Sequence, residues 1–363
     1  MRELNFTKEH TRIAKGVAIL LMLTHHLFAF PDRIHLDQGY ISLFSIGGNN
    51  IELIMGIFGN ICVSMYIFLS GYGIYMSSLK SGKITLRDSF ERIKKLYINY
   101  WIVFVIFIPI GFIFFNKELN VREFILNFVG WSSSYNGEWW FFRLYVELIL
   151  LVPILKFIIN DNLLKSIINV VVLLFFSKII EYGINAGIDK FIPSLIVYEV
   201  QDILFWQACF FIGYICAKFD IYSKVLNLFI KIKMDNKIIY AILLLSIIFV
   251  RSKFGYIFAI DFLLTPILIF SAVNLLYDSV FHKLFILLGE YSTNMWLTHS
   301  FFCYTYFQWL VFKPRVSILI LIWLVILSLG SSYFINYLHK WGSRLFMKCK
   351  NVLKGNDLKE SNI

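Results

Sequence analysis

The stretch TRIAKGVAILLMLTHHLF (residues 11–28) places a basic residue, Lys15, before a long apolar run and ends that run on His25 and His26. A helix that crosses about 30 Å of hydrocarbon needs about 20 predominantly apolar residues. The run lacks the small-residue cleavage site of a secretory signal peptide, and two histidines lie within it. We therefore expect a first transmembrane helix here rather than a cleaved leader.

The composition extends this interpretation to the whole chain of 363 residues. Hydrophobic residues make up 59% and charged residues 16%, and the mean hydropathy is +0.72. A soluble domain has about 45–50% apolar and about 25% charged residues. These values exclude a soluble globule, a disordered chain and a secreted disulfide scaffold. The five cysteines include no CxxC pair, so we expect neither a disulfide framework nor a metal site.

Lysine and arginine are distributed unevenly between the two sides of the predicted membrane. With the N-terminus in the cytoplasm, 24 of the 34 fall in cytoplasmic segments and 8 in outer loops, which agrees with the positive-inside rule. This placement explains the net charge of +11 without a nucleic-acid partner. The sequence predicts an all-α, polytopic membrane helix bundle in the lipid bilayer, with about ten transmembrane helices and both termini inside. The apolar segments are 13–31, 51–78, 97–115, 139–159, 166–182, 196–217, 238–250, 254–277, 284–310 and 316–338.

Lys15 and His26 are predicted to share one face of the first helix. Eleven steps at 3.6 residues per turn make about three full turns, and a rise of about 1.5 Å per residue separates the two side chains by roughly 16 Å. His25 points about 100° away, so the two histidines cannot bind one metal together. Either Lys15 is an anchor and His26 a hydrogen-bonded core residue, or both belong to a functional site. Ionisable groups inside a bilayer are costly, which favours the second interpretation.

Such a face suits the transfer of a group across the membrane. An imidazole that titrates near neutral pH can take a proton from a hydroxyl and return it to a leaving group. A cation about 16 Å away at the inner surface can hold a phosphate. Coenzyme A has a charged nucleotide end and a long, thin arm that ends in a thioester. We therefore hypothesise that its arm enters from the cytoplasm and presents the acyl carbon near His26.

Other ionisable or small residues add candidates to this site. Arg92 and Lys95 lie on one helix face in the basic loop 80–96, where they either enforce topology or hold phosphates. Ser70 interrupts the bulky pattern of the second span and either permits close packing or lines the acyl path. His299 could orient His26 or face the second substrate, and a purely structural hydrogen bond is an equal alternative. Asp261 could orient an imidazole as a carboxylate partner.

Several charged residues have structural interpretations instead. Glu138 precedes two tryptophans, which together are typical of a membrane interface. Arg143 and Glu147 lie one turn apart and are expected to form an ion pair. Lys178 and Glu181 lie three residues apart and either pair or extend toward the interface. Glu199 and Asp202, near an outer boundary, are as consistent with exposure as with function.

Five motifs in the same order resemble acyltransferase family 3, a family of membrane O-acyltransferases. The first is the Arg/Lys-x10-His pattern of Lys15 and His26, and the ten predicted spans agree with this family. The histidine doublet and the missing WSLxxE form of the fourth-span motif depart from the family pattern, which leaves Glu147 without an assigned role. The other motifs are FLSGYGIYM (68–76), ERIKKLYINYW (91–101), WWFFRLYVELILLVPIL (139–155) and LGEYSTNMWLTH (288–299).

The resemblance implies transfer of an acyl group, usually acetyl from acetyl-coenzyme A, to a hydroxyl of an extracytoplasmic polysaccharide or glycolipid sugar. It implies a multi-pass protein of a bacterial cell membrane, with His26 as the catalytic histidine and Lys15 as a cation of the donor site. Arg92 and Lys95 would help to hold the nucleotide phosphates. Residues 1–340 would form the acyltransferase domain and residues 341–363 a basic cytoplasmic tail. Whether His26 carries the acyl group or only moves protons stays open.

Two other classes of protein compete with this prediction. A proton-coupled transporter or flippase of lipid-linked glycans would also use intramembrane His, Asp and Glu, but the chain shows no inverted repeat and no matching pair of broken helices. A haem protein with two histidine ligands could use His26 and His299, but the sequence offers no second pair. We rank both below the acyltransferase.

Overall fold

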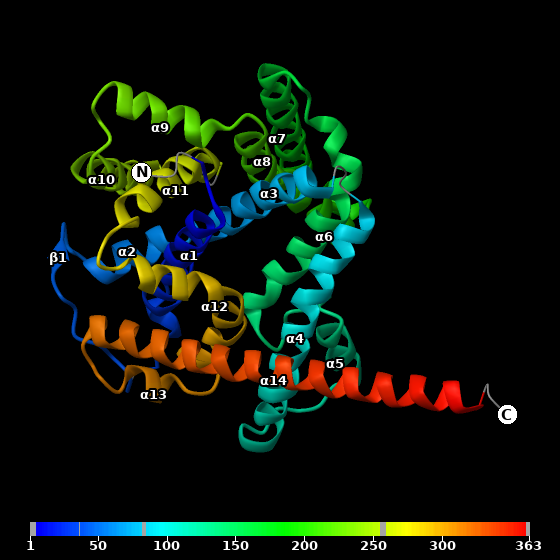
Figure 1. Cartoon of the computed structure of the whole chain (residues 1–363). Coiled ribbons are helices and arrows are strands. Elements are labelled where there is room, and N and C mark those ends of the chain that lie inside the picture. Colours follow the sequence, from blue (N-terminus) through cyan, green and yellow to red (C-terminus); the bar gives the residue numbers. More distant parts are fainter. Residues whose placement is uncertain (1–4, 36, 82–84, 255–258, 361–363) are drawn as a thin grey trace.

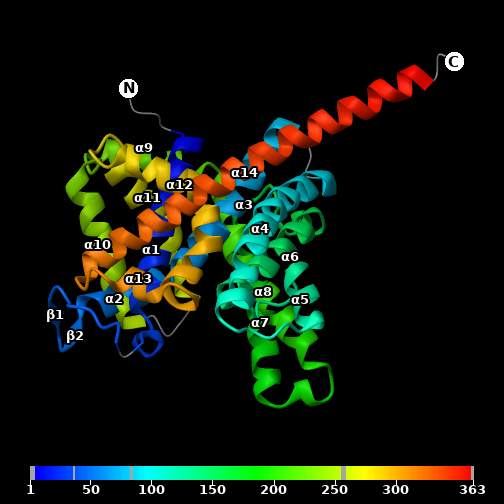
Figure 2. The same cartoon turned by 90° about the horizontal axis from the view of Figure 1, so that it is seen from below.

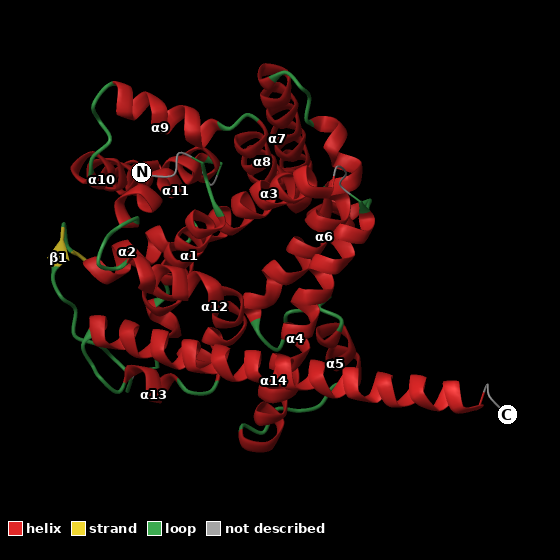
Figure 3. Cartoon of the chain, viewed as in Figure 1, coloured by secondary structure: helices red, strands yellow, loops and turns green. Residues whose placement is uncertain are grey.

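The computed structural model describes residues 5–35, 37–81, 85–254 and 259–360 and is almost entirely helical (Figures 1 and 3). Its only strands, among these residues, are the short antiparallel pair β1 (Ser45–Ile46) and β2 (Asn49–Asn50). The α-helices are α1 (Lys8–Phe28), α2 (Ile51–Gly59), α3 (Cys62–Ser81), α4 (Leu86–Phe114), α5 (Val121–Phe128), α6 (Trp140–Leu155), α7 (Leu163–Asn185), α8 (Ser194–Lys218), α9 (Ile221–Lys231), α10 (Lys237–Phe254), α11 (Ile260–Leu276), α12 (His282–Ser300), α13 (Gln308–Phe312) and α14 (Ser317–Glu360). Short 3₁₀ turns are η1 (Pro31–Arg33), η2 (Gly137–Trp139), η3 (Lys156–Ile158) and η4 (Ile188–Lys190), and a π-helical turn, η5, covers Phe301–Thr305.

The predicted helical class is confirmed, and each predicted apolar segment overlaps a helix or consecutive helices. Within the described residues, five helical stretches are long and apolar enough to cross a membrane, and α11 is a shorter apolar helix. The chain is therefore a multi-pass membrane protein, while the number of ten spans stays a prediction. The long stretches are Ile51–Leu79, Leu86–Phe114, Leu163–Asn185, Ile196–Lys218 and Ser317–Arg344.

Local sequence fixes where α1 and α4 begin. Thr7 caps α1 by accepting a hydrogen bond from the backbone of His10, and the His10 ring accepts one from the backbone of Thr7 in return. Thr85 and Asp88 form the same reciprocal arrangement at the start of α4. Such pairs satisfy the backbone N–H groups that the first turn of a helix leaves free. The two helices that carry Lys15 and Arg92 are thus fixed at their origins.

Glycines allow α1 to lie against α12 at backbone distance. A Cβ atom at Gly16 would overlap the backbone of Phe285, and one at Gly289 would overlap the backbone of Arg12. Small residues at such positions let membrane helices approach closely. Gly16 and Gly289 therefore permit this close contact between α1 and α12.

The helices surround α1, which lies in the middle of the bundle (Figure 1). In Figure 2 both termini and α9 lie toward one side, and the turn that joins α7 to α8 lies on the opposite side. Because α1 starts near the N-terminus, its last turn carries His25 and His26 away from the side of the termini. The helix α14 continues beyond the last predicted apolar segment and projects away from the bundle (Figure 1).

Candidate active site

His26, in the last turn of α1, has hydrogen-bonding partners at both ring nitrogens. Its Nδ1 lies 2.7 Å from the hydroxyl of Tyr304, and its Nε2 lies 3.3 Å from Oε2 of Glu138. The tyrosine hydroxyl is also 3.0 Å from Oε1 of the same carboxylate. The side chains of His26 and Glu138 are only 10% and 13% exposed. The three groups therefore form a closed triangle in which protons can be exchanged.

A change of helical register brings Tyr304 to His26. The helix α12 ends at Ser300, and the π-helical turn η5 comes directly after it. Such turns insert an extra residue into a helix, rotate the residues beyond the insertion, and are frequent at functional sites. Tyr304 lies in this turn, so its ring direction does not follow the α-helical spacing of α12. The turn thus supplies a group that helical periodicity would place elsewhere.

Glu138 is fixed in place from three directions. The short turn η2 carries it, and the side chain of Asn136 accepts a hydrogen bond from its backbone N–H at 3.2 Å. The indole of Trp296 donates to its backbone carbonyl at 3.2 Å. Its carboxylate accepts a hydrogen bond from Arg33 Nη1 at 3.2 Å, which balances part of its charge. The carboxylate is therefore both charged and oriented toward the imidazole.

The two other predicted histidines lie beside His26 but do not bond to it. The ring of His25 is 4.9 Å from that of His26 between centroids, and its Nδ1 donates to the carbonyl of Gly56 at 2.8 Å. The ring of His299 is 4.8 Å away, and its Nδ1 donates to the carbonyl of Trp296 at 2.7 Å. The Nε2 atom of His299 is buried and has no hydrogen-bonding partner among the described residues. Among the described residues, His299 is thus held through Nδ1 alone.

Asp261 has a different partner from the imidazole that the sequence suggested. Its two carboxylate oxygens accept hydrogen bonds from Nε and Nη2 of Arg251 at 2.8 and 3.0 Å, and both side chains are buried. The same guanidinium donates to the backbone carbonyl of Ile57 at 2.6 Å. A buried cation needs such a counterion. Asp261 therefore neutralises Arg251, and the prediction that it orients an imidazole is corrected.

A cavity of about 550 Å³, here called the histidine cavity, opens beside this triangle. His25, His26, Arg33, Glu138 and Arg251 all line it. Its polar groups therefore converge on one space, as they do in ligand sites.

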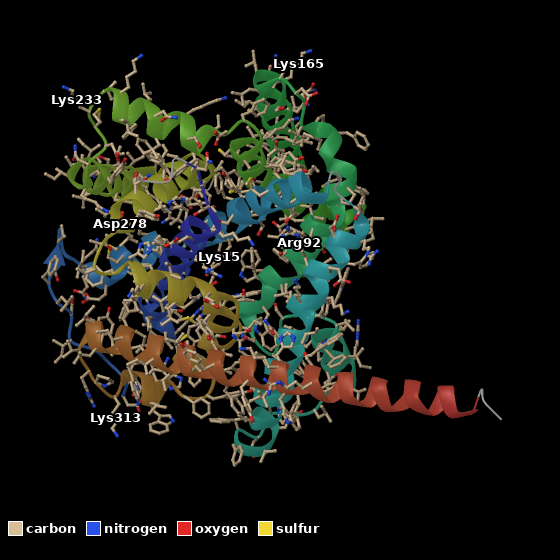
Figure 4. All side chains as sticks on the ribbon, in the orientation of Figure 1. Lys15, Arg92, Lys165, Lys233, Asp278 and Lys313 are labelled. Atoms are coloured by element: carbon tan, nitrogen blue, oxygen red, sulfur yellow. The ribbon has the colours of Figure 1, made fainter. Side chains whose placement is uncertain are left out.

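A second cavity of about 290 Å³, the cation cavity, brings together every residue that the sequence predicted for the donor. Lys15, Ser70, Arg92 and Lys95 line it, and no described residue in its walls is acidic. Lys15 makes neither a hydrogen bond nor an ion pair with any other described side chain, whereas Arg92 donates to Gly73 and Ser77. Lys15 and Arg92 lie close to each other near the centre of Figure 4. Three cations without an acidic neighbour in the described walls give this cavity the charge that a multiply charged anion requires.

The two cavities share a wall. Tyr66, Phe141 and Trp296 line both of them, so these aromatic rings separate the space at Lys15 from the space at His26. The hydroxyl of Tyr66 is buried and has no partner in the described part of the chain; the neighbouring Ser292 donates instead to the Gly289 carbonyl at 3.0 Å. Oδ1 of Asn99, in the cation cavity, is also buried and unpaired. Polar groups of this kind are expected to bind a ligand.

Sequence reasoning missed Glu138 and Tyr304 and assigned Ser70 only in part. Glu138 was interpreted as interfacial, but Trp139 beside it is buried and its own side chain contacts His26. In the sequence, the one feature that could have pointed to Glu138 is an acidic residue directly before two tryptophans. Ser70 lines the cation cavity, but its hydroxyl donates to the Tyr66 carbonyl of its own helix at 2.7 Å.

The predicted ion pairs between neighbouring residues are present. Lys178 binds Glu181 at 2.6 Å, and Arg143 Nε lies 3.7 Å from Glu147. Arg143 also pairs with Glu199, which the sequence left undecided. No group of three or more His, Cys, Asp or Glu among the described residues has the geometry to hold a metal ion.

Comparison with known proteins gives a family match. A family model described as an acyltransferase domain, that of acyltransferase family 3, matches residues 12–337. The matched range contains Lys15, His26, Arg92, Glu138 and Tyr304. No curated protein and no solved structure matches the chain.

Proposed function

The chain belongs to acyltransferase family 3, and on that basis we propose that it moves an acetyl group from cytoplasmic acetyl-coenzyme A to a sugar hydroxyl outside the membrane. The acceptor is a polysaccharide or a glycolipid of the surface of a bacterial cell. The observation that carries this proposal is the wall of Tyr66, Phe141 and Trp296, shared by the cation cavity and the histidine cavity. Family membership favours this activity over a transporter. It likewise favours this activity over a haem protein.

The donor occupies the cation cavity in this proposal. Lys15, Arg92 and Lys95 bind the phosphates at the nucleotide end, where charge-assisted hydrogen bonds are strongest. The arm passes the aromatic wall, and the unpaired Oδ1 of Asn99 accepts a hydrogen bond from an amide N–H of the arm. The thioester then lies in the histidine cavity.

His26 acts as a general base and acid at the thioester. Glu138 accepts a hydrogen bond from the Nε2–H of His26 and so keeps the lone pair on Nδ1. The Tyr304 hydroxyl contacts Nδ1 of His26; when a sugar hydroxyl takes its place, Tyr304 donates to the carboxylate oxygen 3.0 Å away. Nδ1 removes the proton of the sugar hydroxyl as its oxygen bonds to the acyl carbon. The carbon–sulfur bond then breaks, and the imidazolium returns the proton to the thiolate of coenzyme A.

The hydroxyl of Tyr66 is the group best suited to stabilise the negative charge on the thioester oxygen. It is buried, it has no other partner among the described residues, and its side chain lies where the two cavities meet. A donor that is already oriented toward a developing oxyanion lowers the barrier by about 2.7–4 kcal/mol. Tyr66→Phe is expected to lower kcat without changing the affinity for coenzyme A, and a weakened affinity alone would assign the hydroxyl to ground-state binding.

The cations of the donor cavity are expected to determine affinity for coenzyme A. Lys15→Ala, and Arg92→Ala together with Lys95→Ala, each weaken binding by about tenfold or more, because each change removes about 1.5–3 kcal/mol of charge-assisted hydrogen bonding. Isothermal titration calorimetry with coenzyme A measures this. Lys94→Ala is the matched control, since Lys94 is exposed on the same helix and lies outside the cavity. Equal affinity in Lys15→Ala and wild type would remove Lys15 from the donor site.

A deletion strain tests the proposed function directly. NMR spectra of surface polysaccharide from the deletion strain and its parent should differ by the loss of O-acetyl signals, and a plasmid copy of the wild-type chain should restore them. The complementary assay measures radiolabelled acetyl transfer from acetyl-coenzyme A to that polysaccharide by the purified protein. Identical spectra combined with no transfer in vitro would refute the proposal.

A further inference from the structure

A cavity of about 350 Å³, here called the tryptophan cavity, adjoins the histidine cavity, because Trp140 lines both. The proposed chemistry makes no use of its other polar residues. From its position and its walls we propose that it holds the acceptor, as an uncharged sugar ring with free hydroxyl groups. The residues that carry this inference are Trp131, Trp140, Arg143, Glu147, Glu199 and Asp202.

Arg143 contacts residues from three different walls of the tryptophan cavity. Its Nη1 donates to the backbone carbonyl of Trp131 at 3.2 Å, and its guanidinium lies 5.2 Å from the centre of that indole. It also forms ion pairs with Glu147 on its own helix, α6, and with Glu199 on α8. One side chain thus fixes a loop and two helices around the same space. The cavity is a built site rather than a gap between mobile loops.

The charge of the cavity selects against anions. Three carboxylates, those of Glu147, Glu199 and Asp202, face one guanidinium. Asp202 has neither a hydrogen bond nor an ion pair within the described residues, so its carboxylate is available to a ligand. Carboxylates accept hydrogen bonds from hydroxyl groups and repel other anions at short range. Hydroxyl-rich neutral rings fit this cavity, whereas uronic acids and phosphorylated sugars do not.

The two tryptophans supply the apolar surface that a sugar ring requires. Trp131 is 48% exposed and Trp140 is 41% exposed, so both present indole surface to the cavity. The C–H face of a pyranose packs on such rings while its hydroxyls reach polar neighbours. Because indole faces stand beside the carboxylates, the lining of this cavity differs from that of a site that binds a metal cation. The carboxylates are not arranged to hold a metal ion within the described residues.

The position of Trp140 connects this cavity to the reaction. Trp140 lies two residues after Glu138, which contacts His26. A sugar in the tryptophan cavity therefore lies against the wall of the space in which the thioester is proposed to sit. This inference rests on the proposed function, since it assigns the acceptor of that same reaction.

Steady-state kinetics of the purified full chain separates the two substrates. The acceptor probe is surface polysaccharide of the source strain stripped of O-acyl groups with mild alkali, and the donor is radiolabelled acetyl-coenzyme A. Trp131→Ala and Asp202→Asn are expected to raise the KM for the polysaccharide by about tenfold each, because the first removes a ring-stacking contact and the second a charged hydrogen bond; tenfold corresponds to about 1.4 kcal/mol. The KM for acetyl-coenzyme A is expected to stay within twofold.

Matched controls and outcomes make the assay decisive. Trp309→Ala and Glu181→Gln change an exposed tryptophan and an exposed carboxylate outside the cavity, and both KM values should stay at wild-type levels. If wild type transfers acetyl and the cavity variants keep a normal KM for the polysaccharide, the acceptor binds elsewhere while the proposed function stands. If wild type transfers nothing to this probe although it binds coenzyme A, the proposed function fails and this inference fails with it.

Discussion

His26→Ala is expected to lower acetyl transfer by about 10³-fold while expression, membrane insertion and coenzyme A binding stay at wild-type levels. The imidazole is the one group in the histidine cavity that contacts both a carboxylate and a tyrosine hydroxyl. Its loss removes the proton acceptor for the sugar hydroxyl and the proton donor for the leaving thiolate. The cation cavity does not contain His26, so donor affinity is preserved. Transfer by the purified variant and O-acetylation in the complemented deletion strain measure the effect.

Two other histidines serve as comparisons for this variant. His35→Ala changes an exposed histidine that lines none of the three cavities described for the substrates, and it should keep full activity. His25→Ala removes a hydrogen bond to Gly56 that joins α1 to α2, so we expect a smaller loss together with reduced thermal stability. Wild-type O-acetylation by His26→Ala would show that another group is the base.

The helical fold and the cation cavity were predictable because their determinants are local in sequence. Long apolar runs produce helices in lipid, and lysine placement sets the predicted sides. Lys15, Arg92 and Lys95 could be predicted to lie together because all three are at the cytoplasmic ends of predicted transmembrane segments. The sequence predicts that Lys15 and His26 share one face of the first helix. In the structure the two residues line two cavities with a common wall, not one open groove. The aromatic residues of that wall come from three helices, and their meeting is not encoded in any one segment.

The partners of His26 could not be predicted for two physical reasons. Tyr304 reaches the imidazole through a π-helical turn, and a change of register defeats arguments from 3.6-residue periodicity. Glu138 was assigned to the interface because acidic residues and tryptophans are common there. Asp261 was predicted to orient an imidazole, whereas its partner in the structure is Arg251 on the neighbouring helix α10. Buried charge pairs depend on tertiary packing, which spacing along the chain does not reveal.

Glu138→Gln is expected to reduce kcat by about 10³-fold with little change in the KM for acetyl-coenzyme A. Glu138 acts as a positioning residue: its carboxylate accepts a hydrogen bond from the Nε2–H of His26 and stabilises the imidazolium that forms during transfer. A neutral amide of the same size keeps the packing but loses the charge, and its NH₂ group can donate to the imidazole and favour the wrong tautomer. Losing an oriented carboxylate beside a catalytic histidine costs about 10⁴-fold where it has been measured in serine proteases.

A purely structural role for Glu138 makes a different prediction from the proposed one. If Glu138 only held Arg33 and Tyr304 in place, Glu138→Gln would lower thermal stability and kcat together, and Glu138→Asp would behave no better. If it orients and stabilises the imidazole, Glu138→Asp, which keeps the charge, should recover part of the lost kcat, and both variants should unfold at the wild-type temperature. Kinetics and thermal unfolding of the two variants, measured beside Glu181→Gln as the exposed control, therefore separate the roles. Full activity in Glu138→Gln would remove the carboxylate from the mechanism and leave Tyr304 as the only hydrogen-bonding partner that orients His26.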